Sequence, residues 1–206
     1  MTKEEFIESL KQLNIDLTEK QQKQLEKYYN LLIEWNEKIN LTAITLKEDV
    51  YLKHFYDSLT LTKVIDLNKE ESLCDVGTGA GFPGIVLKIA FPHLKLTLVD
   101  ALNKRLEFLK IVCEKLELID VEFVHSRAED FSKTTREKYD VVTARAVAKL
   151  NILLEYCIPL VKTSKYFIAM KGKNSEVDLC QNAFKILDLK LEDDLKFLLP
   201  SENGER

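Results

Sequence analysis

Residues 74–84 read CDVGTGAGFPG, and this stretch decides the fold. Four of the six glycines of the chain fall within eight of its residues, between the apolar runs SLCDV and IVLKIAF. A glycine-rich loop between a strand and a helix can present backbone N–H groups and let a ligand approach the backbone closely. The stretch therefore predicts a strand, a ligand-binding loop and a helix, in that order.

The chain after this loop alternates between strand-like and helix-like segments. The β-rich apolar runs are SLCDV, LKLTLVD, VEFVH, YDVVTA and KYFIAMKG, and helical segments such as LNKRLEFLKIVCEKL and LNILLEYCIPLV separate them. Such alternation is typical of βαβ units and predicts an α/β fold with a doubly wound, mostly parallel sheet. Ligands of such sheets bind beyond the carboxyl ends of the strands, where the glycine loop would lie.

The chain before the loop has a helical pattern. Apolar residues recur at helical spacing over residues 6–13, and Thr18 with Gln21 predicts a capping-box start for a long helix. We interpret the apolar and aromatic stripe of that helix as core packing. A third helix, predicted to start near residue 47 or 48, carries His54 and Asp57.

Length and composition restrict the class of protein. The 206 residues suffice for one α/β domain with an appendage, which we divide into a helical N-terminal extension (1–68) and a Rossmann-like domain (69–206). Four cysteines without paired spacing indicate reduced core residues of a cytoplasmic protein. The sequence contains no CxxC and no HExxH motif, so we do not expect a structural metal. No apolar run is long enough to span a membrane. The formal charge of −4 argues mildly against nucleic-acid binding as a bulk property but leaves a local basic patch open.

The glycine loop can be aligned with two ligand motifs. GAGFPG (79–84) matches GxGxxG, the dinucleotide motif of an NAD-dependent oxidoreductase, with Asp100 at about the right distance. DVGTGAG (75–81) matches DxGxGxG, the form found in the S-adenosylmethionine pocket of Rossmann-like methyltransferases. The second alignment explains more residues, because it places Asp75 at the end of the first strand, near the ammonium-bearing end of the ligand.

Three further positions lie where an adenosine group would be bound. Asp100 ends the second strand, where its carboxylate can accept hydrogen bonds from both ribose hydroxyls of either ligand class. Ala128 and Glu129 follow the third strand, in SRAEDF, and could meet the adenine. A solvent-exposed loop acid remains an equal alternative for Glu129.

Several phrases together resemble a known family: EWNEKINLTAI, KHFYDSL, CDVGTGAGFPGIVLKIAFP, LVDALNKRLEFL, SRAEDF, YDVVTARAVA and AMKG. They are similar to the RsmG (GidB) family of bacterial methyltransferases, which modify N7 of a guanine in 16S ribosomal RNA. The resemblance covers nearly the whole chain. It implies S-adenosylmethionine as the cofactor, 16S rRNA or the small ribosomal subunit as the partner, and a seven-stranded sheet preceded by a helical extension. We expect a monomer without membrane contact.

The resemblance also implies functional residues. His54 and Asp57 match the HxxDSL phrase of the family and could equally tie the N-terminal helices to the sheet. Arg145, after the fourth strand, matches a cofactor-site position, with a surface salt bridge as its alternative. The implied cofactor-binding set is Gly77, Gly79, Phe82, Asp100, Ala128, Glu129 and Arg145.

The RNA-binding residues are less sharply indicated. Five lysines and one acid lie between Lys149 and Lys173, and Lys171 and Lys173 follow the fifth strand at the ligand-binding edge. These two side chains could contact phosphates, or they could belong to a solvated face. LKFLLP (195–200) supplies the first strand of the hairpin that usually ends such a sheet, and the last strand and basic tail are absent, which we interpret as truncation.

The chemistry requires little of the side chains. Methyl transfer from a sulfonium is an in-line displacement, and guanine N7 offers a lone pair, so no general base and no catalytic side chain is expected. The sequence has neither a Pro-Cys dipeptide nor an [Asn/Asp]-Pro-Pro-aromatic phrase, which mark other classes of methyltransferase. The alternatives are an NAD-dependent oxidoreductase and a non-catalytic RNA-binding or ribosome-assembly protein.

Overall fold

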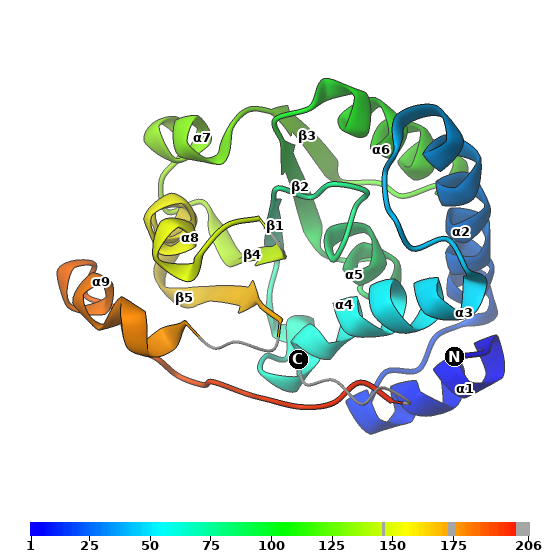
Figure 1. The fold of residues 1–206 in the computed structure, drawn as a ribbon, viewed down its shortest axis with the longest axis horizontal. Coiled ribbons are helices and arrows are strands. Elements are labelled where there is room, and N and C mark those ends of the chain that lie inside the picture. The colour runs from blue at the N-terminus through cyan, green and yellow to red at the C-terminus, as the bar shows by residue number, and fades with distance from the viewer. Residues whose placement is uncertain (146, 173–175, 201–206) are drawn as a thin grey trace.

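A computed structural model of the chain describes residues 1–145, 147–172 and 176–200. Its described part contains one sheet of five strands in the order β3-β2-β1-β4-β5, and all four pairings are parallel. The strand order reverses between β1 and β4, so the predicted doubly wound α/β fold is confirmed (Figure 1). The strands are β1 (Ser72–Val76), β2 (Lys95–Asp100), β3 (Val121–His125), β4 (Tyr139–Arg145) and β5 (Val161–Met170).

Helices cover both faces of this sheet (Figure 1). On one face, α5 (Gly84–Ala90) and α6 (Asn103–Leu116) bury strand residues such as Leu73 and Leu98. On the other, α7 (Ala128–Thr134) and α8 (Leu150–Cys157) bury the neighbours Cys74 and Val99. Because side chains alternate along a strand, these continuous apolar runs fill both cores at once. Ala128 begins α7, so Glu129, for which a loop position is one of the two expectations, lies in the first turn of a helix.

The N-terminal helices pack against the α5–α6 side. They are α1 (Lys3–Leu10), α2 (Glu19–Ile39), and α3 (Lys47–Val50), which runs through a π-helical turn (Tyr51–Tyr56) into α4 (Asp57–Leu59). The predicted capping box of Thr18 and Gln21 is confirmed, and the Gln21 amide also donates to the carbonyls of Ile89 and Ala90 at the end of α5. Short 3-10 helices span Lys11–Leu13, Thr60–Lys63, Leu67–Lys69, Ile158–Leu160 and Val177–Cys180.

One hydrophobic cluster is shared by the two parts of the chain. It contains Phe6, Leu25 and Phe55 from the N-terminal helices together with Ile85 and Leu109 from the α/β part. The division at residue 68 stays a prediction, but the buried side chains on its two sides form a common core. No helix in the described ranges is long and apolar enough to cross a lipid bilayer.

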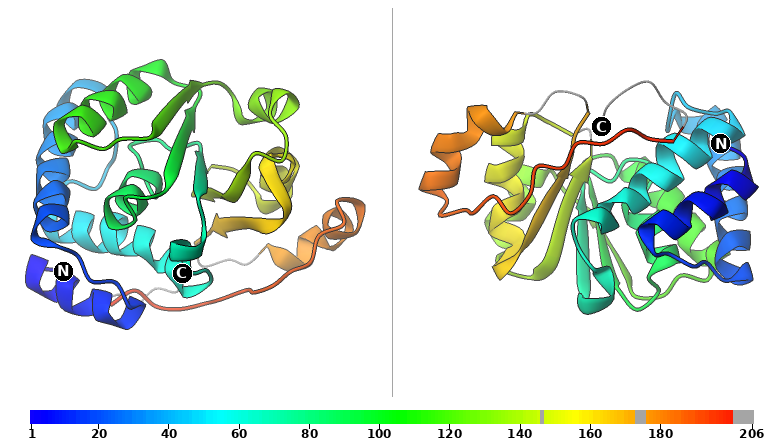
Figure 2. Two further views of the ribbon diagram at one scale, coloured as in Figure 1. Left: turned by 180° about the vertical axis from the view of Figure 1, so that it is seen from behind. Right: turned by 90° about the horizontal axis from the view of Figure 1, so that it is seen from below.

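The C-terminal segment differs from the expectation. After α9 (Gln181–Ile186), the chain runs past the end of the sheet toward α1 without joining it (Figures 1 and 2). LKFLLP is therefore not a sixth strand, and the described part holds five strands rather than the implied seven; only Leu198 makes an isolated β-bridge. Leu199 is buried in the cluster of the N-terminal helices, and the Lys63 ammonium lies over the Phe197 ring. Burial of these side chains competes with pairing at the β5 edge.

Candidate functional site

The glycine loop (residues 77–83) joins β1 to α5 at the carboxyl ends of the strands, beside the point where the strand order reverses. Gly77, Gly79 and Gly81 have φ values of 71°, 60° and 98°, a region that residues with a side chain adopt only at a cost. The amides of Gly77 and Thr78 donate to the carbonyl of Val99 at 2.8 and 3.0 Å, so the loop is fastened to β2. This is the position at which doubly wound sheets bind ligands.

The four glycines of the loop and of the first position of α5 are needed for different reasons. A Cβ on Gly81 would lie 2.5 Å from the Tyr28 hydroxyl, and one on Gly84 would lie 2.8 Å from the Asp75 carboxylate. A Cβ on Gly77 would lie 2.6 Å from Val147. At Gly79 the nearest atom is a backbone oxygen 4.0 Å away. Three glycines thus admit the protein's own side chains, and Gly79 is the one of the four that leaves room for a ligand.

Asp75 lies beneath the loop and joins its two ends. Its Oδ2 accepts hydrogen bonds from the Thr78 hydroxyl at 2.7 Å and from the Gly84 amide at 2.9 Å. Burial raises the pKa of this carboxyl to about 6, against the lowering effect of those two hydrogen bonds. The side chain is fully buried, and Oδ1 has no hydrogen-bond partner in the described structure. Asp75 therefore shapes the loop from below.

Asp100 ends β2 and faces the loop. Its Oδ2 accepts from the Gly79 amide at 2.9 Å and lies 3.4 Å from the Arg105 guanidinium, and its Oδ1 accepts from the Leu102 amide at 2.8 Å. Each carboxylate oxygen has more than one lone pair, so hydroxyl groups of a ligand could add to these contacts. The structure thus brings together Asp100 and the one loop glycine with open space.

Ala128 and Glu129 lie next to this position in the sheet. β3 pairs with β2 so that His125 is opposite Asp100, and Ala128 begins α7 shortly after β3 ends. Ala128 packs against the core beneath α7 and α8, whereas the Glu129 side chain is 35% exposed and pairs with Arg127 at 3.5 Å. Both alternatives for Glu129, a ligand contact and a solvated acid, are compatible with this position.

Arg145 connects the end of β4 to the N-terminal helices. Its guanidinium donates to Asp57 Oδ2 at 2.8 Å and to the Lys53 carbonyl at 3.1 Å, and it lies 3.2 Å from His54 Nδ1. The Phe82 ring stacks on the His54 ring at 4.4 Å between centroids and has the Arg145 guanidinium at 5.3 Å. The Arg145–Asp57 pair is largely buried rather than a surface salt bridge. The residues of the HxxDSL phrase therefore tie the N-terminal helices to the sheet and to the glycine loop.

Tyr28 of α2 was interpreted as core packing, and it also reaches the site. Its ring lies 5.4 Å from the Phe82 ring, and its hydroxyl donates to the Ala80 carbonyl in the glycine loop. Burial raises the pKa of Tyr28 well above its usual value, which keeps the hydroxyl protonated as a donor. A buried tyrosine hydroxyl needs a hydrogen-bond partner. A tyrosine within the apolar stripe of this helix is therefore the sequence signal that could have indicated a polar contact of Tyr28.

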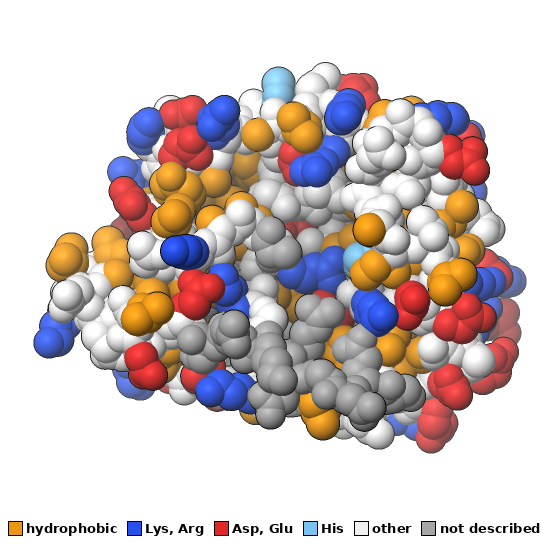
Figure 3. Space-filling model, in the orientation of Figure 1, with side chains coloured by type: hydrophobic (Ala, Val, Ile, Leu, Met, Phe, Trp, Pro, Cys, Tyr) orange, Lys and Arg blue, Asp and Glu red, His pale blue; other side chains and the backbone are white. Residues whose placement is uncertain are grey.

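Of the two lysines predicted to contact phosphate, the structure places one. Lys171 Nζ donates to the Ala148 carbonyl at 2.8 Å and pairs with Glu176 at 2.9 Å, while Lys173 lies outside the described residues. On the face drawn in Figure 3, basic side chains are interspersed with acidic ones rather than gathered in one patch. Lys171 is thus engaged within the protein, and a phosphate would compete with Glu176 for it.

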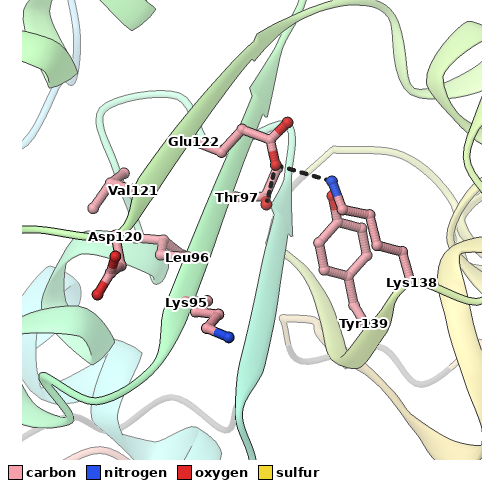
Figure 4. Close-up of a pocket in the computed structure, with 8 residues that line it drawn as sticks. All are labelled: Lys95, Leu96, Thr97, Asp120, Val121, Glu122, Lys138 and Tyr139. Carbon is pink, nitrogen blue, oxygen red and sulfur yellow. Dashed lines mark hydrogen bonds and ion pairs between the residues drawn. The ribbon is translucent and has the colours of Figure 1, made fainter.

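A hollow lies at the amino ends of the strands, opposite the end that carries the glycine loop (Figure 4). It is bordered by residues at and just before the beginnings of β2, β3 and β4, among them Thr97, Glu122 and Lys138. Glu122 accepts from Thr97 at 3.2 Å and pairs with Lys138 at 3.0 Å, so these polar groups satisfy one another. Doubly wound sheets bind ligands at the other ends of their strands, and we therefore assign the site to the glycine loop.

Among the described residues, no group of three or more His, Cys, Asp or Glu side chains is placed to hold a metal ion.

Comparisons with known proteins find similar sequences along nearly the whole chain. The family model described as rRNA small subunit methyltransferase G matches residues 21–198. The chain is 52% identical over 209 aligned residues to the ribosomal RNA small subunit methyltransferase G of Staphylococcus aureus (strain JH9), covering 100% of this chain and 87% of that protein. It is 51% identical to the protein of the same name from Listeria welshimeri, covering 100% and 88%.

Solved structures show the same fold at much lower sequence identity. A SAM-dependent methyltransferase from Aquifex aeolicus superposes with a TM-score of 0.54 and 16% identity, over 74% of this chain and 87% of that one. A protein from Corynebacterium glutamicum superposes with a TM-score of 0.56 and 14% identity, over 84% and 85%. The α/β fold is thus shared with structures whose sequences differ widely from this one.

Proposed function

The chain belongs to the rRNA small subunit methyltransferase G family, and from this membership we propose that it transfers a methyl group from S-adenosylmethionine to N7 of a guanine in 16S ribosomal RNA. The observation that carries the proposal is the match to this family along nearly the whole chain. The glycine loop and Asp100 lie together at the ligand-binding edge of the sheet, which fits a nucleoside-containing cofactor.

The residues of the site fit S-adenosylmethionine. The space at Gly79 lets a ligand lie against the backbone, and Asp100 beside it offers acceptors for two ribose hydroxyls. Ala128 and Glu129, beyond the neighbouring strand, would meet the adenine, and Gly77 with Phe82 would border the methionine side. Arg145 would act on this side through Phe82, because its guanidinium lies against that ring and is otherwise engaged by Asp57.

The reaction needs alignment more than proton transfer. When bound, the cofactor supplies an electrophilic methyl group on a sulfonium. Guanine N7 carries a lone pair in the neutral base, so the new N–C bond forms as the S–C bond breaks and no proton has to leave. The protein contributes proximity, orientation and a fixed loop. The arrangement therefore requires no catalytic base.

The proposed partner is 16S rRNA, free or within the small ribosomal subunit, in the cytoplasm. Lys173 would contact its phosphates, Lys171 would do so only where a phosphate displaces Glu176, and a single chain would suffice for binding. The four cysteines are all free and buried, which fits a reducing compartment.

The proposal is tested by the acceptor atom. We expect the protein to methylate 16S rRNA that lacks the modification, and to leave unmethylated a matched RNA with 7-deazaguanine at the target. The deaza RNA should bind with similar affinity, because one ring atom changes while the phosphate contacts remain. Single-turnover transfer of labelled methyl groups measures both. Transfer to the deaza RNA at an undiminished rate would reject N7 as the acceptor.

The cofactor is tested separately by calorimetry. Asp100→Ala should weaken S-adenosylmethionine binding by about 1–3 kcal/mol, because hydrogen bonds to a charged group are lost. Asp193→Ala removes an exposed acid far along the C-terminal segment and serves as the control. Binding of NAD in place of S-adenosylmethionine would favour an oxidoreductase, and RNA binding without either cofactor would favour an assembly protein.

A further inference from the structure

Val147 closes one side of the glycine loop. A Cβ on Gly77 would lie 2.6 and 3.2 Å from the two methyl groups of Val147, so this side chain rests directly on the Gly77 backbone. Gly79, two residues on, has open space. The glycine loop is therefore covered by Val147 at Gly77 and open at Gly79.

The position of Val147 is not fixed by burial of its own side chain, which is 40% exposed. It belongs to a short segment, residues 147–150, which we call the strap and which leads into α8. The Ala148 carbonyl accepts a hydrogen bond from Lys171 Nζ at 2.8 Å, and the Leu150 amide donates to Glu176 Oε2 at 2.5 Å. Lys171 and Glu176 also pair with each other at 2.9 Å. Two side chains from beyond β5 thus hold the strap at two points.

Glu176 takes the place of a helix cap at α8. The residue before this helix, Lys149, provides no side-chain hydrogen bond to its amino end, and Glu176 accepts from the Leu150 amide instead. The Leu150 amide and the Lys171 ammonium together lower the pKa of Glu176 below its usual value. Since both partners favour the charged carboxylate, the contact is intact at neutral pH.

We propose that Lys171 and Glu176 are positioning residues that hold Val147 against Gly77, and that Val147 is the wall against which the methionine side of the cofactor is seated. The inference rests on the proposed function. It assigns a role in cofactor binding to two residues that lie beyond β5 and touch the glycine loop only through the strap. Lys171, predicted from the sequence to contact RNA, acts here on the cofactor side of the reaction.

Three variants test the wall and its support. Val147→Ala removes the wall and should raise the Kd and the KM for S-adenosylmethionine by about fivefold, with a smaller loss in kcat. Glu176→Ala should raise the same two constants by about threefold, because the strap is released but the valine is retained. Glu176→Gln keeps an acceptor for the Leu150 amide and should recover most of this loss.

A double variant shows whether the two residues act through the same contact. Val147→Ala/Glu176→Ala should bind S-adenosylmethionine no more weakly than Val147→Ala alone, since the support has no wall left to position. Asp178→Ala is the matched control, because it removes an exposed acid two residues from Glu176 and leaves both described hydrogen bonds of the strap in place. In the ligand-free protein, the Leu150 amide should exchange hydrogen faster in Glu176→Ala than in Asp178→Ala.

The outcomes separate this inference from the proposed function. If the wild-type protein neither binds S-adenosylmethionine nor methylates rRNA, the proposed function is refuted. If the wild-type protein is active but the Kd for S-adenosylmethionine is unchanged in Val147→Ala and in Glu176→Ala, only the role assigned to Val147 is refuted. Tighter cofactor binding in Val147→Ala would also overturn it, because Val147 would then compete with the cofactor. Fully additive losses in the double variant would break the assigned link between Glu176 and Val147.

Discussion

The two segments that border the candidate site are held by different forces. The glycine loop is held from below by the buried Asp75 carboxylate, from the side by the Tyr28 hydroxyl, and at Phe82 by the His54 ring. The strap is held by two hydrogen bonds, from Lys171 to the Ala148 carbonyl and from the Leu150 amide to Glu176, and these two side chains, paired with each other, are each about a quarter exposed. Buried, fully packed contacts fix one geometry, whereas partly exposed ion pairs contribute little and can be exchanged. The loop is therefore preorganised and the strap adjustable.

This difference gives the N-terminal helices a place in the site. α2 supplies Tyr28, and the helix that runs from α3 into α4 supplies His54 and Asp57. Each of these side chains ends at the glycine loop or at Arg145 beside it. The helical part therefore does more than cover a face of the sheet, because it sets the position of the segment on which the cofactor would lie.

The largest expected effect is the loss of stability when a side chain is added inside the packed part of the glycine loop. Gly81→Ala places a methyl group within 2.8 Å of Tyr28, Ile85 and Leu109, at a φ of 98°. Overpacking and the unfavourable backbone conformation together should cost about 4 kcal/mol of the free energy of unfolding. Gly79→Ala meets the same type of backbone cost in open space and should lose about 1 kcal/mol. Urea unfolding of both variants measures the difference, and equal losses would contradict the account of the loop.

The next effect concerns the charge beneath the loop. Burial raises the pKa of Asp75 from 3.8 to about 6, so the folded protein binds this proton more tightly than the unfolded chain does. The contribution of Asp75 to the free energy of unfolding is therefore greatest below about pH 4, and it falls by about 2–3 kcal/mol as the pH rises through 6. Asp100 nearby adds to the raised pKa, while Arg145 opposes it.

Asp75→Asn isolates this contribution. Its amide oxygen can still accept from the Thr78 hydroxyl and the Gly84 amide, but it carries no titrating charge. Urea unfolding of wild type and variant from pH 4 to pH 7 should show wild type losing about 2–3 kcal/mol relative to Asp75→Asn as the pH rises. If the difference in the free energy of unfolding between the two proteins stays constant over this range, the pKa of Asp75 is not raised.

The sequence was sufficient for most of the fold. Five apolar runs became the five strands, and the capping box of Thr18 and Gln21 started α2 as predicted. These features succeed because they are local: a strand buried on both faces is a continuous apolar run, and a cap is set by residues three apart. The strand prediction for LKFLLP failed because Leu199 is buried in the cluster of the distant N-terminal helices and Phe197 packs against it, which no local pattern records.

The site was predictable in position but not in its contacts. The spacing of the loop and Asp100 placed them at one edge, and the structure joins them through the Gly79 amide. The sequence could not show that Val147 covers Gly77, because residues 70 positions apart meet only through the pairing of β4 with β1. It also left His54 and Asp57 with two alternatives, which the Arg145 contacts resolve.

The smallest expected effect sharpens the contrast between loop and strap. Glu176→Ala removes a partly exposed ion pair and the acceptor of the Leu150 amide at the start of α8. The ion pair is worth less than about 1 kcal/mol, and loss of a cap costs typically about 1 kcal/mol, so the free energy of unfolding should fall by about 1 kcal/mol. Leu150 and Leu154 keep α8 in place through their buried contacts with Cys180. Urea unfolding measures this loss, with Asp178→Ala as the control. Since Gly81→Ala should cost several times more, a loss of similar size in Glu176→Ala would mean that the strap is as firmly built as the loop.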